Sequence, residues 1–158
     1  MINVFSRILS ADSFFNSSIS PSQSFHPYFS TSINYSVMEE KCKDYILYTL
    51  PNSFFVDVYQ LKDKFTDEQI KVWGETDLES PFGVTSLKWG SLVLITKQNS
   101  GDLYNFEFSL PLHMRYQPAI PGNIGSIQRR HVLITTPWPL VIRVCDNIEN
   151  DMSGINFF

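Results

Sequence analysis

The sequence has little of what a membrane-spanning or metal-dependent protein needs. Its 158 residues include only two cysteines and three histidines, and 18% of them are charged. No window of about 18 apolar residues occurs, so no segment has the length and hydropathy of a transmembrane helix. The cysteines lack CxxC spacing and the histidines form no HxH or HExxH pattern, which excludes the common zinc motifs. We therefore predict no metal and no cofactor.

Charged residues are few, and acidic residues outnumber basic ones. The formal net charge is −4, and a chain without a basic patch is a poor candidate for binding nucleic acid. The low charged fraction suits a domain whose surface lies partly against a protein partner. The N-terminal segment 1–15 also lacks the unbroken apolar run of a secretory signal, because Ser6, Ser10 and Asp12 interrupt it.

Aromatic residues are abundant. They make up 15% of the chain, and 43% of all residues are apolar, which is enough for one hydrophobic core in a chain of this length. Short apolar or aromatic runs separated by turn residues predict strands. The expected strands span 28–37, 45–50, 54–61, 91–97, 103–110, 112–117, 131–135 and 140–145.

Two of these strands have different patterns. In 103–110 the aromatic residues Tyr104, Phe106 and Phe108 alternate with polar ones, which predicts one buried and one exposed face. The run 92–95 is continuously apolar, which is typical of a strand covered on both faces.

The connections between strands can also be predicted. Residues 98–102 contain Gly101 and are expected to form a hairpin loop between the strands on either side. Proline cannot continue a central strand, so we expect a bend at Pro111, with 112–116 crossing to another edge or sheet.

Only residues 66–73 have a helical pattern, with Thr66 as a candidate N-cap and Asp67 in the first turn. The Ser-rich residues 10–24 are expected to be a mobile lead-in. We predict a single all-β domain, an antiparallel β-sandwich with one short helix. The expected divisions are a flexible segment at 1–24, the β domain at 25–147 and a tail at 148–158.

The patterns of an enzyme are missing. Gly122 and Gly125 form only a lone GxxG, which is too weak to indicate a phosphate-binding loop. Asp63, Asp67 and Glu68 lie around the expected short helix, where solvated carboxylates are common. We therefore predict that the chain has no catalytic activity of its own.

The segment 111–118 is the most unusual part of the sequence. On a strand, His113 and Arg115 would point to one side and Tyr116 to the other. Two interpretations are open. The segment is either a half-exposed strand with a polar outer face, or a partly cationic stripe that docks on a partner through the planar guanidinium of Arg115.

Two features matter only in the secretory pathway. Asn16 and Asn34 each begin an N-glycosylation sequon. Cys42 and Cys145 are either two buried thiols or, in an oxidising compartment, a disulfide that closes a loop of about 100 residues. The spacing leaves both alternatives open.

Several segments together resemble the PIG-X family. The string FFVDVYQL at 54–61, which contains Asp57 and Tyr59, is similar to the family's aromatic-Val-Asp-x-Tyr-x-Leu pattern. The string LPLHMRY at 110–116 looks like the family's Leu-Pro-x-His-x-Arg-Tyr. Weaker matches are an acidic segment at 76–81, a Cys-Asp pair at 145–146 and a Phe-His pair at 25–26.

The resemblance implies a non-catalytic, stabilising subunit of the endoplasmic-reticulum mannosyltransferase that adds the first mannose to the GPI-anchor precursor. The implied partner is a polytopic catalytic subunit, PIG-M, with the present domain on the lumenal side of the membrane. Family members end in a transmembrane helix, so we expect membrane association through the partner or through a helix missing from this chain. Asp57, Tyr59, His113, Arg115 and Tyr116 are carried over as motif residues and candidate partner-binding residues.

A glycan- or lipid-glycan-binding β-sandwich is the alternative, with Trp89, Trp138 and Tyr116 stacking on sugars. Burial of Trp89 and Trp138 would exclude it. An enzyme with a convergent polar pocket is a weaker third option. For a partner-binding subunit, we expect Arg115→Ala to weaken association without unfolding the domain.

Overall fold

The structure is a computed structural model that describes residues 14–35, 42–66, 69–74, 76, 90–98, 105–116, 133–145 and 155–157. Within these ranges the chain forms ten strands and one short helix. The elements are β1 (Phe14–Ser20), β2 (Tyr28–Asn34), β3 (Cys42–Leu50), β4 (Phe54–Phe55), α1 (Val58–Lys62), β5 (Ile70–Gly74), β6 (Ser91–Gln98), β7 (Asn105–Pro111), β8 (His113–Met114), β9 (Leu140–Cys145) and β10 (Ile155–Phe157).

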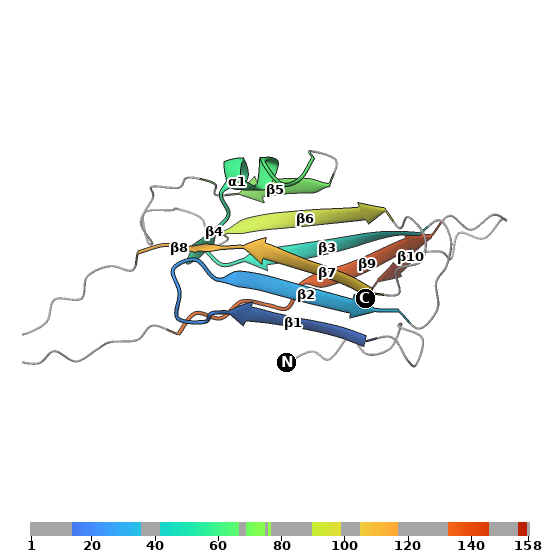
Figure 1. Ribbon diagram of the computed structural model, residues 1–158, viewed down its shortest axis with the longest axis horizontal. Coiled ribbons are helices and arrows are strands. Elements are labelled where there is room, and N and C mark those ends of the chain that lie inside the picture. Colours follow the sequence, from blue (N-terminus) through green and yellow to red (C-terminus); the bar gives the residue numbers. More distant parts are fainter. Residues whose placement is uncertain are drawn as a thin grey trace, which may run out of the picture.

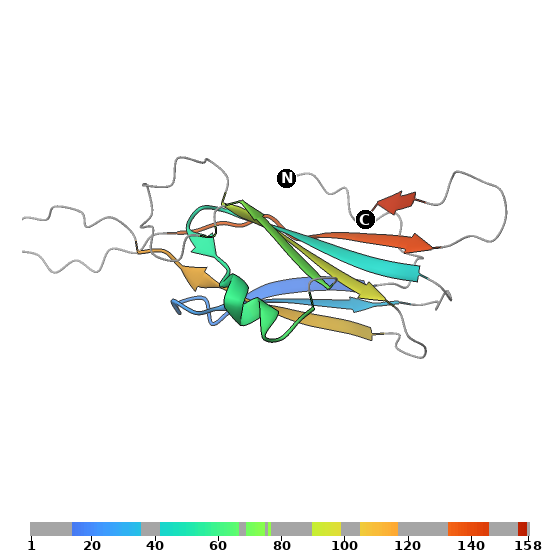
Figure 2. The same cartoon turned by 90° about the horizontal axis from the view of Figure 1, so that it is seen from above.

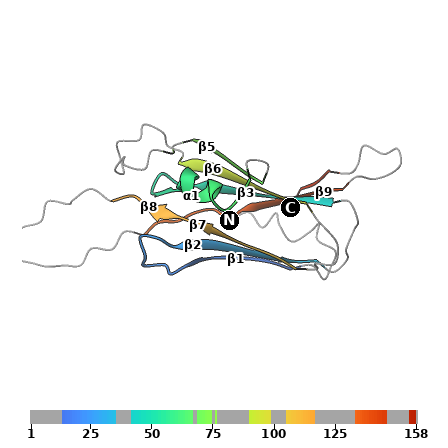
Figure 3. The same ribbon diagram turned by 45° about the horizontal axis from the view of Figure 1, so that its top comes forward.

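Two antiparallel sheets lie face to face. One has the strand order β1-β2-β7 and the other β10-β9-β3-β6-β5, while β4 and β8 form a small third sheet. Figure 2 shows the two larger sheets as separate layers, and Figure 3 shows the same layers from another angle. The predicted fold class, an all-β sandwich with one short helix, is confirmed. No helix in the described part of the chain is long and apolar enough to cross a bilayer.

Alternate side chains of both sheets form the core between them. The predicted alternation in 103–110 is confirmed for Phe106 and Phe108, which are buried, while Tyr104 lies outside the described residues. The run 92–95 is not covered on both faces, because Leu92 is exposed. The core contains Phe29, Ile33, Ile46, Tyr48, Leu50, Val93, Ile95, Phe106, Phe108, Leu110 and Val141.

Hydroxyl groups connect three strands through this core. The Tyr48 hydroxyl on β3 donates to Thr31 Oγ1 on β2 at 2.8 Å, and Thr31 Oγ1 lies 2.8 Å from Ser17 Oγ on β1. Ser17 Oγ also donates to the carbonyl oxygen of Ser30 at 2.9 Å. Burial raises the pKa of Tyr48 above its ordinary value of 10.0, so the hydroxyl keeps its proton and remains a donor.

A buried ion pair joins β3 to β9. Asp44 and Arg143 are opposite each other in the ladder, with Arg143 Nε 2.8 Å from Asp44 Oδ1 and Nη2 3.1 Å from Oδ2. The guanidinium also lies 3.4 Å from the centroid of the Tyr35 ring. Two parallel hydrogen bonds and a ring contact offset the cost of removing both charges from water. The pair thereby fixes the register of β3 against β9.

The expected mobile lead-in at 10–24 contains a strand. β1 pairs with β2 along its whole length, and Phe15 and Ile19 pack against the core. Ser17 lies on the same inner side, where its hydroxyl is hydrogen-bonded. The alternation of Phe15, Ser17 and Ile19 is a period-2 signal that the serine content of the segment conceals.

Two local predictions are wrong in the middle of the chain. The segment 54–61, expected to be one strand, contains β4 and most of α1. Residues 70–73 of the expected helix 66–73 are in strand β5. Pairing of β5 with β6 along 70–74 outweighs the weak helical pattern, because tertiary contacts routinely override local propensity. Asp67 and Glu68 lie outside the described residues.

Connections were predicted with mixed success. The expected hairpin around 98–102 is wrong, since β6 pairs with β3 and β5 while β7 pairs with β2 in the other sheet. The change of sheet after Pro111 is confirmed, because β8 pairs with β4. Residues 133–135 of the expected strand 131–135 are not in a strand, and residues 131–132 lie outside the described ranges.

A close backbone approach accounts for Gly90. A Cβ atom at this position would lie 2.5 Å from the carbonyl oxygens of Leu50 and Pro51. These are backbone atoms, so relief would require moving the end of β3.

We expect Gly90→Ala to lower the free energy of unfolding by roughly 1–3 kcal/mol, because the added methyl group displaces backbone. Urea denaturation of the variant and the unchanged chain measures the difference. Ser18→Ala, at an exposed position on β1, is the control and should change stability by less than about 0.5 kcal/mol. Equal stability of the Gly90→Ala variant and the unchanged chain would contradict the close approach.

Candidate functional site

Three segments that are distant in sequence meet at one end of the sandwich, where Figure 1 shows β4, β8 and α1. The backbone N–H of Leu112 donates to the carbonyl of Pro27, and that of Met114 donates to the carbonyl of Phe25, each at 2.9 Å. On the other edge, β8 pairs with β4, and the N–H of Arg115 donates to the carbonyl of Ser53 at 2.9 Å. The segment around β8 is therefore held from both sides. We call Phe25, His26, Tyr59, His113 and Tyr116 the motif end.

Two histidines contact each other at this end. His26 Nδ1 lies 3.0 Å from His113 Nδ1, and the rings are nearly perpendicular, with their centroids 4.8 Å apart. His113 Nε2 lies 3.2 Å from Gln60 Oε1 on α1. The face of the His113 ring stacks on the ring of Phe55, with the ring centroids 5.1 Å apart. His113 is thus positioned by β4, α1 and the segment before β2 together.

The two Nδ1 atoms are close enough to share one hydrogen bond, so only one of them can carry a proton in this contact. One imidazole must donate and the other accept, so protonation of both rings places two N–H groups against each other. Burial lowers the pKa of His113, the neighbouring His26 lowers it further, and Asp57 acts in the opposite direction. These effects favour a neutral His113.

Asp57 has a structural role. It is the N-cap of α1, and its Oδ1 accepts hydrogen bonds from the backbone N–H of Tyr59 at 2.8 Å and of Gln60 at 3.2 Å. Capping fixes the first turn of α1. It thereby sets the position of Gln60 against His113. The Asp-x-Tyr spacing is thus explained by a helix start, a signal that the strand prediction for 54–61 overlooked.

Arg115 and Tyr116 are placed opposite to the sequence expectation. Arg115 is only 2% exposed, and its guanidinium carbon lies 4.8 Å from the centroid of the Phe55 ring. Tyr116 is 75% exposed. The strand ends at Met114, so the alternation assumed for 112–117 does not continue to these residues. His113 and Arg115 do not form an exposed cationic stripe.

The exposed part of the motif end is aromatic. Phe25 is 53% exposed, Tyr59 76% and Tyr116 75%. Phe25 and Tyr116 pack on each other with their ring centroids 5.3 Å apart. His26 is also exposed and adds a polar group to this surface. Large rings with polar atoms at their edges are the side chains that protein interfaces favour.

Sequence reasoning missed part of this arrangement. It selected Asp57, Tyr59, His113, Arg115 and Tyr116, all of which the structure brings to the same region. It gave little weight to Phe25 and His26 and none to Phe55 or Gln60. His26 and His113 are 87 positions apart in the sequence, and no spacing rule relates residues at that separation. Only the tertiary fold could therefore place the two rings together.

The polar contacts at the motif end position its side chains. Among the described residues, no group of three or more His, Cys, Asp or Glu side chains is placed to hold a metal ion. The carboxylate of Asp57 is occupied by two backbone N–H groups. The two histidines contact each other, and His113 also contacts Gln60. These contacts hold the side chains of the motif end in fixed positions.

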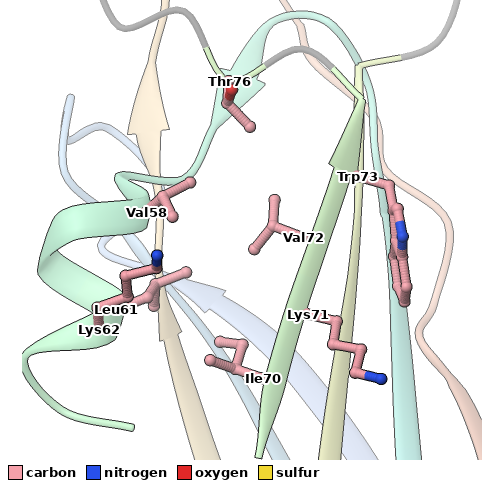
Figure 4. Close-up of a pocket in the computed structure, with 8 residues that line it drawn as sticks. All are labelled: Val58, Leu61, Lys62, Ile70, Lys71, Val72, Trp73 and Thr76. Atoms are coloured by element: carbon pink, nitrogen blue, oxygen red, sulfur yellow. The ribbon is translucent and has the colours of Figure 1, made fainter. Parts of the chain in front are cut away.

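A pocket lies between α1 and β5. It has a volume of about 430 Å³. Figure 4 shows Ile70 and Val72 pointing toward α1, with Lys71 and Trp73 on the other side of β5. Among the described residues, its lining contains two lysines but no carboxylate or histidine. The lining residues are Val58, Leu61, Lys62, Ile70, Lys71, Val72, Trp73 and Thr76.

The remaining candidate residues lie elsewhere. Asn16 is exposed on β1, and Asn34 is half-buried on the neighbouring strand β2, directly opposite Phe14. Cys42 and Cys145 are opposite each other in the ladder between β3 and β9. None of the four belongs to the motif end.

Of the two tryptophans expected to stack on sugars in the glycan-binding alternative, the structure describes only Trp138. Trp138 is 59% exposed, with its ring centroid 5.7 Å from that of Phe15 on β1. Trp89 lies outside the described residues. The condition that would exclude glycan binding, burial of both tryptophans, is therefore not met by Trp138.

The His26–His113 contact generates a prediction for nuclear magnetic resonance. We expect the pKa of His113 to lie below the ordinary value of 6.5. His26→Asn should raise it only part of the way, since burial is the larger cause. A pH titration of the imidazole resonances measures both. A His113 pKa at or above 6.5, or one that His26→Asn leaves unchanged, would contradict this account.

The same shift links folding to pH. Because the folded-state pKa of His113 is lowered, the unfolded chain binds more protons between that pKa and 6.5. The contribution of neutral His113 to stability should be complete above about pH 6.5 and be lost as the pH falls through this window. The difference in unfolding free energy between the unchanged chain and His113→Asn, measured across pH, isolates this effect.

Burial separates the roles of two neighbouring motif residues. Arg115→Ala should lower the free energy of unfolding by roughly 1–3 kcal/mol, because it removes buried packing and the contact with Phe55. Tyr116→Ala removes an exposed ring and should change stability by less than about 0.5 kcal/mol. Chemical denaturation compares the two. Equal effects would contradict the assignment of Arg115 as a support and Tyr116 as a surface residue.

Comparison with known proteins identifies the family of this chain. The sequence profile of the PIG-X / PBN1 family matches residues 22–156. Protein PBN1 of Yarrowia lipolytica is 34% identical over 127 residues, which cover 72% of this chain and 23% of that protein. Protein PBN1 of Debaryomyces hansenii is 38% identical over 125 residues, which cover 77% of this chain and 25% of that protein. The chain thus spans about a quarter of the length of these curated relatives. It belongs to the PIG-X / PBN1 family.

Proposed function

We propose that this chain is an accessory, non-catalytic subunit that stabilises the mannosyltransferase adding the first mannose to the GPI-anchor precursor. It would act on the lumenal side of the endoplasmic-reticulum membrane. Family membership supports a role in GPI-anchor biosynthesis, and the family names suggest a subunit. The observation that carries the proposal is the convergence of three motif segments at one end of the sandwich, where several of their aromatic side chains are exposed.

The motif end is the proposed contact for a polytopic, PIG-M-like catalytic subunit. Its exposed groups are Phe25, Tyr59, Tyr116 and the imidazole of His26. Burial of such rings against a partner gives apolar contact area, while the hydroxyl and imidazole groups add directional hydrogen bonds. Few charges have to be desolvated on this surface, which lowers the cost of association.

Buried neighbours preorganise this surface. Arg115 packs on Phe55, Phe55 stacks on His113, and His113 contacts His26 and Gln60. A surface whose rings are already positioned loses less conformational entropy when a partner binds. Arg115 is therefore a buried residue that holds the side chains of the proposed interface in place. Arg115→Ala is expected to reduce folding and association together, in place of the separate effect expected from sequence.

A glycan-binding module is the second candidate. It is favoured by the exposure of Trp138 and Tyr116, because exposed rings stack on sugars. Titration of the labelled chain with a mannose-containing glycan, followed by nuclear magnetic resonance, tests it. Shifts confined to Trp138 or Tyr116 would favour glycan binding. The absence of shifts at millimolar glycan would leave protein binding as the better account of these rings.

The proposed interface predicts the outcome of a pull-down. A tagged chain is incubated with gently solubilised endoplasmic-reticulum membranes, and bound proteins are identified by mass spectrometry. The double variant Phe25→Ala/Tyr116→Ala should recover at least about tenfold less of the polytopic mannosyltransferase, since central aromatic residues dominate interface energies. Phe14→Ala removes an exposed ring from β1 and is the matched control.

Two outcomes would count against the proposal. Equal recovery with the double variant would remove the motif end as the contact surface. Absence of the mannosyltransferase from every pull-down, including one with an added membrane helix on the tagged chain, would remove the accessory-subunit function itself. Recovery only with the added helix would indicate that membrane attachment is needed in addition to the motif end.

A further inference from the structure

We propose that Cys42 and Cys145 form an intramolecular disulfide that fastens β9 to β3. The inference concerns the covalent structure of the domain and goes beyond the proposed binding function. The two residues are the only cysteines in the chain. A bond within the chain therefore has one possible connectivity.

The backbone register brings the two positions together. Cys42 and Cys145 are directly opposite partners in the antiparallel ladder. Directly opposed residues in an antiparallel ladder have Cα atoms roughly 4.5–5.5 Å apart. A disulfide needs Cα atoms about 4.4–6.8 Å apart. Bond formation at this rung would thus require no change of strand pairing.

A nearby rung of the same ladder fixes this register. Asp44 and Arg143 are also opposite partners, and their side chains form the buried ion pair. A slip of β9 by one residue would move Arg143 to the other face of the sheet and separate it from Asp44. The ion-pair rung lies two positions along both strands from the rung of Cys42 and Cys145, so the register that it fixes is also the register of the two cysteines. The pair of cysteines is therefore held in register by a specific interaction.

The rung lies where both strands end. Cys42 is the first residue of β3 and Cys145 is the last residue of β9. Strand ends are where pairing opens most easily. A covalent bond at this rung would prevent fraying from this side. It would also enclose α1, β4 and β8 in the closed loop, so that most of the motif end lies within it.

The chemistry is an ordinary two-electron oxidation. The two thiols lose two protons and two electrons as the S–S bond forms, and an external disulfide oxidant is reduced to two thiols. Secretory compartments supply such oxidants. Stabilisation comes largely from the reduced entropy of the unfolded chain, because the closed loop is long.

Peptide mapping tests the bond directly. The full chain is folded in a glutathione buffer with the redox poise of the endoplasmic reticulum, alkylated, digested without reduction and analysed by mass spectrometry. We expect one cross-linked peptide pair containing Cys42 and Cys145 and no alkylated thiol. Alkylation of both cysteines in the folded protein would overturn the proposal. So would a disulfide found only between two chains.

Thermal unfolding tests the consequence. The Cys42→Ser/Cys145→Ser variant and the reduced chain should melt at similar temperatures, on the order of 10 °C below the oxidised chain. The reduced chain controls for the effect of the serine hydroxyls. Equal melting of the oxidised and reduced chains would overturn the stabilising role. These experiments contain no partner protein, so their outcome is independent of whether the mannosyltransferase is recovered in a pull-down.

Discussion

Backbone hydrogen bonds along both edges of the segment around β8 determine the geometry of the motif end. Leu112 and Met114 bond to the segment before β2, while β4 pairs on the opposite edge. Because neither edge is free, the side chain of His113 is held between Phe55, Gln60 and a second histidine. The exposed rings of this surface therefore rest on an ordered base, which is what preorganised recognition requires.

The fold class and most of the long strands follow from residue patterns that are local. Phe106 and Phe108 alternate with polar residues, and the strand that contains them is confirmed. Predictions failed where the structure depends on contacts distant in sequence. Residues 70–73 of the expected helix 66–73 are in a strand, because β5 pairs with β6. β1 was overlooked because the groups that satisfy Ser17 belong to another strand.

The candidate site was predicted in its residue types but not in their arrangement. Motif resemblance identified His113, Arg115 and Tyr116, and the family is confirmed. The assumption of a continuing strand reversed the exposure of Arg115 and Tyr116, because β8 ends at Met114. The contact between His26 and His113 could not be predicted from the sequence. It depends on hydrogen bonds along both edges of the β8 segment, one to the segment before β2 and one to β4.

The central claim is that the motif end is the surface that meets the membrane-embedded catalytic subunit. Site-specific photo-crosslinking in endoplasmic-reticulum membranes tests it most directly, with the photoreactive residue placed either at position 116 or at position 18 on the outer side of β1. The account predicts a crosslink to the polytopic mannosyltransferase from position 116 and none from position 18. Crosslinking from position 18 alone would place the interface on the β1-β2-β7 sheet and contradict the account.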